Sequence, residues 1–341
     1  MMLKHAPTLD DVAKHANVST ATVSRCINTP AQVREPTRAR VQAAISELGY
    51  TPHFGGMALA SNRTNTIGAV IPTMENAIFA RGLQVLQEEL SAAGVTLLVA
   101  TSLYDSEQEA HQIRALVARG VDGIVLIGDA RSDEIYEFLR NRKIPFVLMW
   151  THDTDLQHCY VGFDNKLAAE SIAHHVIRLG HRKIGMISGI TKDNDRAHAR
   201  VQGVKDVLAH NGIPLEPPNL VEVPYSLEDG RLATLELLRR QPRPTAIFFG
   251  NDVQAAGALK AAKQLKLDVP NDVSIIGFDD IDLASAVEPA LTTVHVPHRR
   301  MGREAAHIIL QMAREKSAGE SVLLKTNIVE RASLAKCKFA D

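Results

Sequence analysis

The chain has 341 residues, enough for two or three domains with a large core, and 45% of them are hydrophobic and 23% charged. No segment approaches roughly 18 consecutive apolar residues, so the sequence predicts no transmembrane helix. The first residues form no apolar signal core, and the three cysteines stand far apart without a paired metal or redox motif. We therefore expect a cytoplasmic protein in a reducing environment.

The net charge of −1 conceals an asymmetry along the chain. Residues 1–65 contain seven Lys and Arg and four Asp and Glu, which gives +3, whereas the remainder carries −4. A basic N-terminal segment followed by an acidic remainder suits a head that binds nucleic acid. This positive excess is modest and is weak evidence alone, so the interpretation of the head depends on its sequence motifs.

Two short helices are predicted near the N-terminus. Thr8 can cap a helix whose first turn holds Asp10 and Asp11, because carboxylates are favoured at the positive end of the helix dipole. The apolar pattern breaks at residues 17–18, and Ser19 can cap a second helix that continues to about residue 28. Two short helices joined by about three residues form a helix-turn-helix.

A third helix completes the predicted head, residues 1–50. Pro36 lies in its first turn, and Gly49 can take the left-handed conformation that ends a helix. Tyr50 then supplies the apolar contact after the cap. Three such helices would form a compact bundle.

The second predicted helix carries small or polar residues over most of its surface, and only Val23 and Ile27 are clear core residues. The others that matter are Thr20, Ala21, Thr22, Ser24, Arg25 and Asn28. Such a face fits the major groove of DNA, where arginine binds guanine and threonine methyls contact thymine. The alternative is the solvated face of an ordinary helix.

This stretch resembles the LacI/GalR (lactose-repressor) family of transcriptional regulators. The matching segments, in the same order and spacing, are residues 8–13, 18–19, 22–25, 41–50 and Pro52. The resemblance implies an α/β protein: a three-helix helix-turn-helix head and a two-lobed body similar to periplasmic sugar-binding proteins, with parallel sheets. It also implies a homodimer on a pseudo-palindromic DNA operator, and a tetramer stays open.

The resemblance assigns two kinds of DNA contact to the head. Thr20, Ala21 and Arg25 would face base edges, and Asn28 belongs to the same surface. Ser19, Thr22 and Ser24 would mostly hold phosphates. Phosphate contacts position such a head, and base contacts specify its site.

Residues 51–64 are expected to be a hinge. In the resembling family a leucine at the place of Leu59 wedges into the minor groove, where it kinks the duplex. Gly55 and Gly56 depart from the family pattern, and each costs roughly 1 kcal/mol of helix stability relative to alanine. We therefore expect the hinge to become helical only on the operator. The alternative is that Leu59 is an exposed linker residue.

From residue 65 onward, apolar strands alternate with helices in two successive runs. This alternation predicts two parallel sheets covered on both faces, with a ligand cleft at the carboxyl ends of the strands. The resemblance continues through this body, 65–341, and implies three crossings between its lobes. Lobe N would span about 65–163 and 294–324, and lobe C about 164–293 and 325–341.

By the resemblance, a small effector lies between the lobes, contacted by Phe79, Phe163, Arg196, Arg200, Tyr225, Asn251 and Asp279. Arginine donors facing an aspartate suit a sugar, and two guanidinium groups would favour a sugar acid. Some segments are similar to gluconate repressors of that family. The alternatives are a loop cap for Asp279, a surface ion pair for Arg200, and ordinary core for Tyr225 and Phe163.

An enzyme with a Rossmann-like body is the alternative of a different class. The glycines of residues 123–128 do not have the dinucleotide-binding spacing, and there is no P-loop and no Gly-x-Ser-x-Gly elbow. The adjacent His174 and His175 point about 100° apart on a helix and lack further ligands. We therefore expect no enzymatic activity, no cofactor, no metal and no membrane partner.

Overall fold

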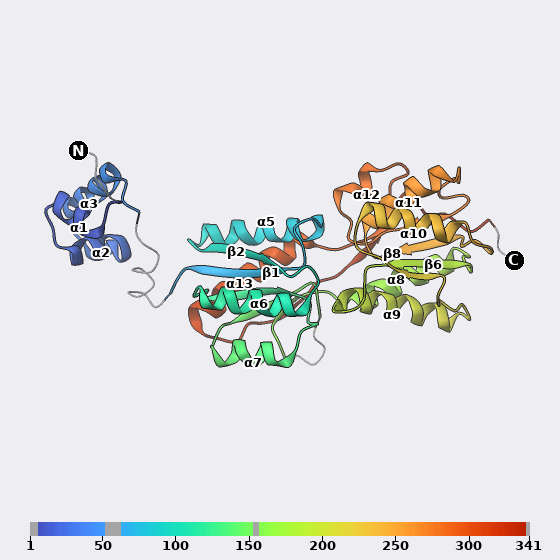
Figure 1. The fold of residues 1–341 in the computed structure, drawn as a ribbon, viewed down its shortest axis with the longest axis horizontal. Coiled ribbons are helices and arrows are strands. Elements are labelled where there is room, and N and C mark those ends of the chain that lie inside the picture. The colour runs from blue at the N-terminus through green and yellow to red at the C-terminus, as the bar shows by residue number, and fades with distance from the viewer. Residues whose placement is uncertain (1–5, 52–62, 153–156, 339–341) are drawn as a thin grey trace. The chain divides into compact units, whose positions relative to one another are not determined.

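The computed structural model describes residues 6–51, 63–152 and 157–338. The contacts divide the chain into two units, Met1–Thr66 and Ile67–Asp341 (Figure 1). Leu59, Gly55 and Gly56, on which the hinge interpretation depends, lie outside the described residues. The head and the body are therefore described separately.

The head is a bundle of three α-helices with one short 3₁₀ turn. The elements are α1 (Leu9–His15), α2 (Thr20–Asn28), η1 (Pro30–Gln32) and α3 (Glu35–Leu48). The Thr8 hydroxyl accepts the Asp11 amide while the Asp11 carboxylate accepts the Thr8 amide, which is a complete capping box. Gly49 ends α3 with φ 62°, and Tyr50 is buried beside it. These helices position α2 on a rigid base.

One sequence-based assignment in α2 needs correction. Val23 is fully buried as expected, but the second core side chain is Cys26, which is 6% exposed, while Ile27 is only partly buried. Cys26 follows Val23 by three residues and so faces the same side of the helix, toward Val12 and Val41. The short turn η1 was also not predicted.

Lobe N is a six-stranded sheet in the order β11-β5-β4-β3-β1-β2. Its strands are β1 (Thr66–Ile71), β2 (Thr96–Thr101), β3 (Gly123–Ile127), β4 (Phe146–Met149), β5 (Tyr160–Gly162) and β11 (Val322–Leu323). The strand pairs β1–β3, β3–β4, β4–β5 and β5–β11 are parallel. Successive side chains of a strand point to opposite faces of the sheet, so alternate residues of each strand pack into two separate hydrophobic cores.

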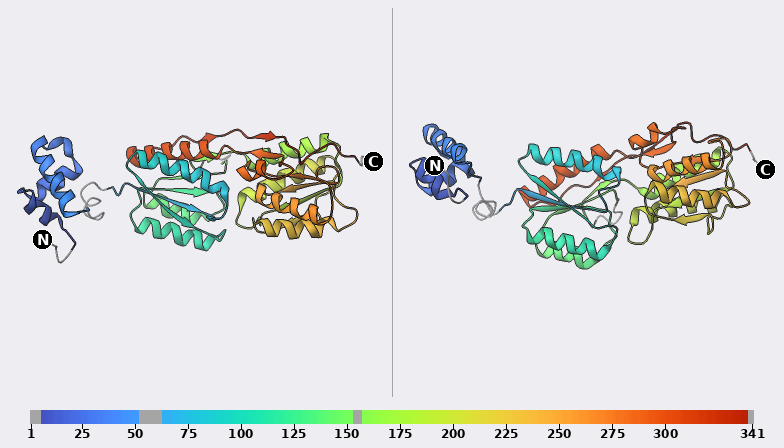
Figure 2. Two further views of the ribbon diagram at one scale, coloured as in Figure 1. Left: turned by 90° about the horizontal axis from the view of Figure 1, so that it is seen from above. Right: turned by 45° about the horizontal axis from the view of Figure 1, so that its top comes forward.

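Helices cover both faces of this sheet (Figures 1 and 2). One core joins the sheet to α5 (Ala77–Ala92) and α13 (His298–Glu315), which pack on each other. The other joins it to α6 (Ser106–Ala118) and α7 (Asp133–Asn141). Burial on both faces explains why these strands are nearly continuous apolar runs.

Lobe C repeats this plan with a four-stranded parallel sheet in the order β7-β6-β8-β9. Its strands are β6 (Ile184–Ser188), β7 (Leu220–Glu222), β8 (Ala246–Phe249) and β9 (Ser274–Ile276). The pair α8 (Asn165–Arg178) and α9 (Asp195–His210) packs on one face. The pair α10 (Leu227–Leu238) and α11 (Asp252–Gln264) packs on the other, beside the short α12 (Asp282–Ala286).

The chain passes between the lobes at three places. It leaves lobe N after β5 and enters lobe C at α8, which begins at Asn165. The other two connections run through β10 (Thr293–His295) and β12 (Asn327–Val329), which pair with each other as an antiparallel ribbon. Beyond β12, the Ser333 hydroxyl donates to the carbonyl of Ile275 and so fastens the C-terminal segment to lobe C.

The Thr8 capping box leads to a test of the head. Replacing Thr8 with Ala removes the acceptor for the Asp11 amide and should cost about 1 kcal/mol of helix stability. Hydrogen exchange of the α1 amides in the full chain should quicken several-fold. Thr8→Ser keeps the hydroxyl and is the matched control. Equal protection of α1 in Thr8→Ala and Thr8→Ser would contradict the role of the cap.

Candidate functional site

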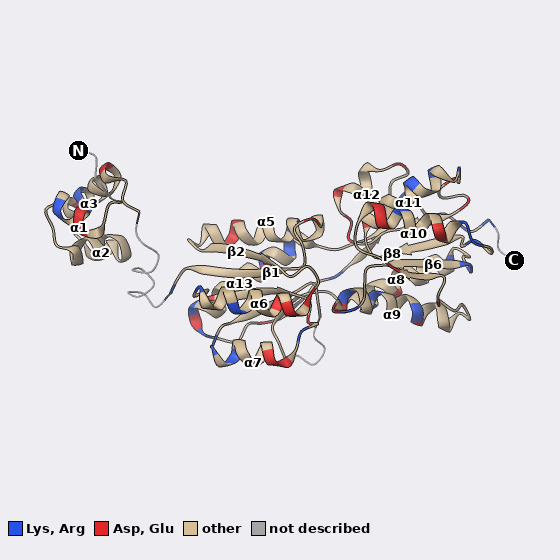
Figure 3. Cartoon of the chain, in the orientation of Figure 1, with Lys and Arg blue, Asp and Glu red and all other residues tan. Residues whose placement is uncertain are grey.

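The exposed surface of α2 is the candidate site of the head. Ser19, Thr20, Ala21, Arg25 and Asn28 are exposed, and Thr22 and Ser24 are partly exposed. The helix contains no acidic residue (Figure 3). Within the part of the chain that the structure describes, no carboxylate pairs with Arg25. The surface therefore offers one unneutralised guanidinium beside several hydroxyl and amide groups.

Local hydrogen bonds orient the small polar groups of this surface. The Ser19 hydroxyl caps α2 by accepting the Thr22 amide at 3.2 Å, and it lies 2.9 Å from the Thr22 hydroxyl. The Asn28 amide donates to the Ser24 hydroxyl at 3.2 Å. Ser19 also stands at the positive end of the helix dipole, where an anion such as a phosphate is favoured.

The candidate site of the body is a cavity between the two lobes. It is lined by Ile78, Phe79, Tyr104, Trp150, Asn194, Arg196, Arg200, Tyr225, Asn251 and Asp279. Six of these ten were expected from the sequence. The cavity has room for roughly one water molecule, so a solute the size of a sugar would require the lobes to separate.

Phe163, the seventh residue expected here, does not line the cavity. Its ring stacks on Phe278 with 6.3 Å between centroids, and it is 1% exposed within the core. Phe163 follows β5 at the first lobe connection, and the Asn165 amide lies 3.5 Å from its carbonyl. Phe163 thus packs in the core beside the cavity in this structure, and its role as a wall of the site stays a prediction.

Arg200 on α9 is buried and held from several directions. Its Nε donates to Asn165 Oδ1 at 2.9 Å, one terminal nitrogen donates to the Gly250 carbonyl at 2.9 Å, and the other lies 3.5 Å from Asp279 Oδ1. Its guanidinium also stacks over the Phe278 ring at 3.8 Å from the centroid. The alternative of a surface ion pair is thereby excluded, because Arg200 is only 5% exposed.

Asp279 follows β9 and is fully buried. Its φ of 102° lies in the region that side chains rarely adopt, so the surrounding structure must hold it there. Burial raises the pKa of its carboxyl to about 6, although the charges of Arg200 and Arg196 oppose that rise. One oxygen faces Arg200, and among the described residues the other, Oδ2, has no hydrogen-bond partner.

Asn251 caps α11 at the carboxyl end of β8. Its Oδ1 accepts the Gln254 amide at 2.9 Å, whereas its buried Nδ2 has no partner among the described residues. The wall formed by Asn251 and Asp279 therefore presents one unused donor and one unused acceptor. A buried polar atom without a partner is costly, so such atoms mark a surface suited to a polar ligand.

Just behind this wall lies a second buried carboxyl, Asp252. It accepts hydrogen bonds from the Thr293 hydroxyl at 2.7 Å and the Ile281 amide at 2.9 Å. Burial and the charge of Asp279 raise the pKa of Asp252 to about 8. Burial thus favours the protonated form of Asp252, whereas Asp279 faces the guanidinium of Arg200.

Aromatic side chains form the lobe N side of the cavity. Phe79 and Trp150 meet edge to face with 5.4 Å between centroids, and Trp150 Nε1 donates to His298 Nδ1 at 3.3 Å. Tyr104 approaches Tyr225 of lobe C at 6.0 Å. Tyr104 and Trp150 both have positive φ, 60° and 61°, which turns their side chains into the cleft. No sequence signal marks such backbone conformations for Tyr or Trp.

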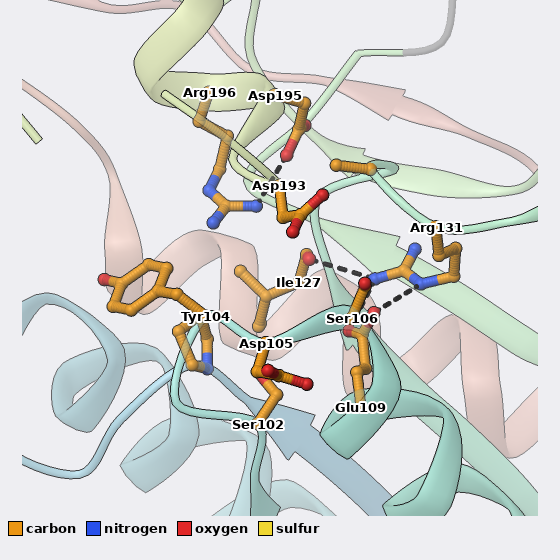
Figure 4. A pocket seen from close by; sticks show the side chains of 12 residues that line it. Ser102, Tyr104, Asp105, Ser106, Glu109, Ile127, Arg131, Asp193, Asp195 and Arg196 are labelled. Atoms are coloured by element: carbon orange, nitrogen blue, oxygen red, sulfur yellow. Dashed lines mark hydrogen bonds and ion pairs between the residues drawn. The ribbon is translucent and has the colours of Figure 1, made fainter. Parts of the chain in front are cut away.

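Arg196 stands where the cavity meets the outer part of the cleft (Figure 4). Its guanidinium donates to Asp195 Oδ1 at 2.9 Å, so it is paired with its chain neighbour rather than with Asp279. On the opposite side of this outer cleft, Arg131 forms a buried ion pair with Glu109 at 2.9 Å. The sequence indicated Arg196 but not these partners.

No group of three or more His, Cys, Asp or Glu side chains could hold a metal ion in the part of the chain that is described. None of the described helices is long and apolar enough to span a membrane.

Comparison with known proteins gives consistent matches over both units. Residues 8–53 match "Bacterial regulatory proteins, lacI family", and residues 173–334 match a "Periplasmic binding protein-like domain". The HTH-type transcriptional repressor PurR of Klebsiella pneumoniae is 34% identical over 337 residues, which cover 98% of each chain.

Solved structures extend the likeness to the fold. The Lac repressor dimer bound to operator and the anti-inducer ONPF matches with a TM-score of 0.85 at 25% identity, covering 97% of this chain and 100% of that one. The transcriptional regulator CelR in complex with cellobiose matches with a TM-score of 0.70 at 29% identity, covering 96% of this chain and 99% of the other. The chain belongs to the lacI family of bacterial regulatory proteins.

Proposed function

We propose that this protein is a transcriptional repressor whose operator affinity is set by a sugar or sugar acid bound between the lobes of its body. It acts in the cytoplasm as a homodimer, with two heads on a pseudo-palindromic operator. The observation that carries the effector proposal is the buried wall of Asp279 and Asn251, with one unused acceptor and one unused donor. The proposal that the head binds DNA is supported by the exposed surface of α2, which has no acidic residue, and by the match of the head to the lacI family.

In the head, Thr20, Ala21 and Arg25 would read base edges, with Asn28 beside them. Ser19, Thr22 and Ser24 would bind phosphates. The exposure of these side chains, the lack of acidic residues on α2, and the capped helix start at Ser19 support this assignment. The relation of CelR, PurR and the Lac repressor to this chain points to the same use of the head.

In the body, the effector would enter between the separated lobes. There it would form hydrogen bonds with the buried polar atoms of the cavity wall that lack partners. A ligand hydroxyl can donate to Asp279 Oδ2 and accept from Asn251 Nδ2, since a hydroxyl does both. Phe79, Trp150 and Tyr225 would cover the apolar faces of a sugar ring. The CelR neighbour is complexed with cellobiose, which fits this class of ligand.

The choice between a sugar and a sugar acid depends on Arg196. Arg200 is committed to Asn165, Gly250 and Asp279, so its charge is already balanced. Arg196 is paired with Asp195 but retains further donors beside the cavity. A neutral sugar suits the balanced charges, and a sugar acid would have to compete with Asp195 for Arg196.

The first experiment is a fluorescence anisotropy titration of the full chain on a labelled DNA fragment from upstream of its own gene. It is repeated at fixed salt with a panel of sugars and sugar acids, because such affinities depend steeply on salt. Nanomolar binding that one compound weakens or tightens supports the proposal and names the effector. The absence of binding at low salt with every compound would overturn it.

Arg25→Ala tests the assignment of the head. The loss of one guanine contact should cost about 1–3 kcal/mol, which corresponds to roughly 5-fold to 150-fold weaker operator binding. Binding to unrelated DNA should change far less. Lys14→Ala removes the same charge from α1, where it pairs with Asp10, and serves as the control. Equal losses on operator and unrelated DNA would assign Arg25 to the phosphates instead.

Asp279→Asn tests the effector wall. The amide keeps the size of the side chain but replaces an acceptor oxygen by a donor, so the operator complex should lose its response to the effector by tenfold or more in effector concentration. Because Asp279 also balances the charge of Arg200, the thermal unfolding of the variant is measured beside its operator affinity without effector. Glu288→Gln, an acidic-to-amide change outside the cavity lining, is the control. An unchanged response in Asp279→Asn would remove Asp279 from the site.

A further inference from the structure

A tight turn of lobe C, residues 279–281, lies between β9 and α12. Its first two residues, Asp279 and Asp280, have positive φ angles of 102° and 56°, a conformation that side chains rarely adopt. Their side chains leave the turn toward different partners. Asp279 faces Arg200 and the cavity, whereas Asp280 faces the segments that connect the two lobes.

The Asp280 carboxylate bonds both of the connections that form the β10–β12 ribbon. Arg331, which follows β12, donates to Asp280 Oδ1 at 2.6 Å, and His295 Nδ1 at the end of β10 lies 2.8 Å from Oδ2. Burial works against ionisation of this carboxyl, but hydrogen bonds from Arg331 and His295 keep its pKa below the usual value. An ionised carboxylate only accepts hydrogen bonds, so His295 Nδ1 is the donor. One side chain thus joins the two connections.

Arg331 is fixed by further bonds to the segment that precedes β10. Its Nη1 donates to the Leu291 carbonyl at 2.9 Å, and its amide donates to the Thr292 hydroxyl at 2.9 Å. The side chains of Arg331 and Asp280 are only 21% and 15% exposed. Water and salt screen such a pair less than a pair on the open surface, where ion pairs contribute little.

Asp252 holds the same turn from inside lobe C. Its amide donates to the Phe278 carbonyl at 2.9 Å, and its Oδ2 accepts the Ile281 amide at 2.9 Å. Phe278 and Ile281 stand on either side of Asp279 and Asp280, so the two aspartates are held together as one unit. A displacement of Asp280 is therefore expected to displace Asp279 as well.

Lobe N meets this turn at its backbone carbonyls. His298 Nε2, at the start of α13, lies 3.1 Å from the Asp279 carbonyl, and Arg81 of α5 donates to the Asp280 carbonyl at 3.4 Å. Arg81 also pairs with Asp282, the residue after the turn. These contacts between the lobes depend on where the turn lies.

We propose that Asp280 is a positioning residue that fastens the lobe C ends of β10 and β12 to this turn and thereby holds the lobes closed over the cavity. Without its carboxylate, the two connections lose their shared attachment, and the turn is no longer held against His298 and Arg81. The equilibrium then moves toward separated lobes. Closure of this kind requires neither DNA nor a sugar, so it is separate from the proposed function.

The single tryptophan of the chain reports on closure. Trp150 lines the cavity and is fully buried in this structure, so acrylamide reaches it when the lobes separate. The quenching constant is measured on the full-length protein without any sugar. Asp280→Ala removes both acceptor oxygens and should raise this constant roughly threefold to tenfold, because the net contribution of one or two hydrogen bonds shifts an equilibrium by about that factor.

Asp280→Asn is the matched rescue variant. Asparagine tolerates the left-handed conformation of this position, its oxygen can accept from Arg331, and its amide can donate to a neutral His295 ring. Its quenching constant should stay within roughly twofold of the original value, since both hydrogen bonds can be kept. Each variant is measured below the onset of its own thermal unfolding, so that a loss of stability alone does not change the result.

Arg331→Met removes the partner of Asp280 and leaves the residues of the turn unchanged, so it tests the contact even if Asp280→Ala does not fold. It should raise the quenching constant by a similar factor. The variant with both substitutions should rise no further, because both substitutions act through one contact.

Glu288→Gln is the control, because Glu288 is an exposed acidic residue between α12 and β10, and it should leave the quenching constant unchanged. Unchanged quenching in Arg331→Met would overturn the proposal. So would effects of the two substitutions that multiply in the double variant, because they would show that Asp280 and Arg331 act independently.

Discussion

The buried guanidinium of Arg200 is the constraint around which the body's site is arranged. A guanidinium stays charged in proteins, and its burial is tolerable only when acceptors and an opposite charge surround it. Here the acceptors come from distant parts of the chain: the start of α8 (Asn165), the end of β8 (Gly250) and the loop after β9 (Asp279). One side chain thus fixes three segments at the carboxyl edge of the lobe C sheet.

The same arrangement separates residues that hold the site from atoms left available for a ligand. The N–H groups of Arg200 bind acceptors inside the protein, one of which is Asn165 Oδ1. The Nδ2 of Asn165 in turn donates to the Trp150 carbonyl of lobe N at 2.9 Å. Asp279 and Asn251 each use one atom for the fold and keep another unused. Because the fold already holds these side chains in place, less conformational entropy is lost when a ligand binds.

Most of the helices and strands could be predicted from the spacing of apolar residues and from helix-capping residues, because these patterns lie close together in the sequence. The helices begin and end where the capping residues predict: α1 begins after Thr8, α2 begins after Ser19, and α3 ends at Gly49. Cys26 was not assigned to the core face of α2, although its spacing from Val23 was available and cysteine is often buried. The inter-lobe ribbon and the short η1 turn have no comparable local pattern.

The resemblance to the lacI family, rather than a local sequence pattern, indicated most of the residues that line the cavity. Arg196, Arg200, Asn251 and Asp279 are polar groups at the ends of predicted strands or on the following helix, and all line the cavity. Tyr104 and Trp150 reach it through positive φ angles that are set by tertiary packing. Phe163 packs on Phe278 in the core beside the cavity, and the sequence does not distinguish an aromatic residue of the core from one that lines a cleft.

The antiparallel ribbon of β10 and β12 has a consequence for how the body can move. Two connections that were independent could twist and slide separately, but these are tied to each other by hydrogen bonds over Thr293–His295 and Asn327–Val329. A tied ribbon bends readily across its face and resists shear within its plane. The pairing therefore couples the two connections, so that a change in the path of one strand is passed to the other.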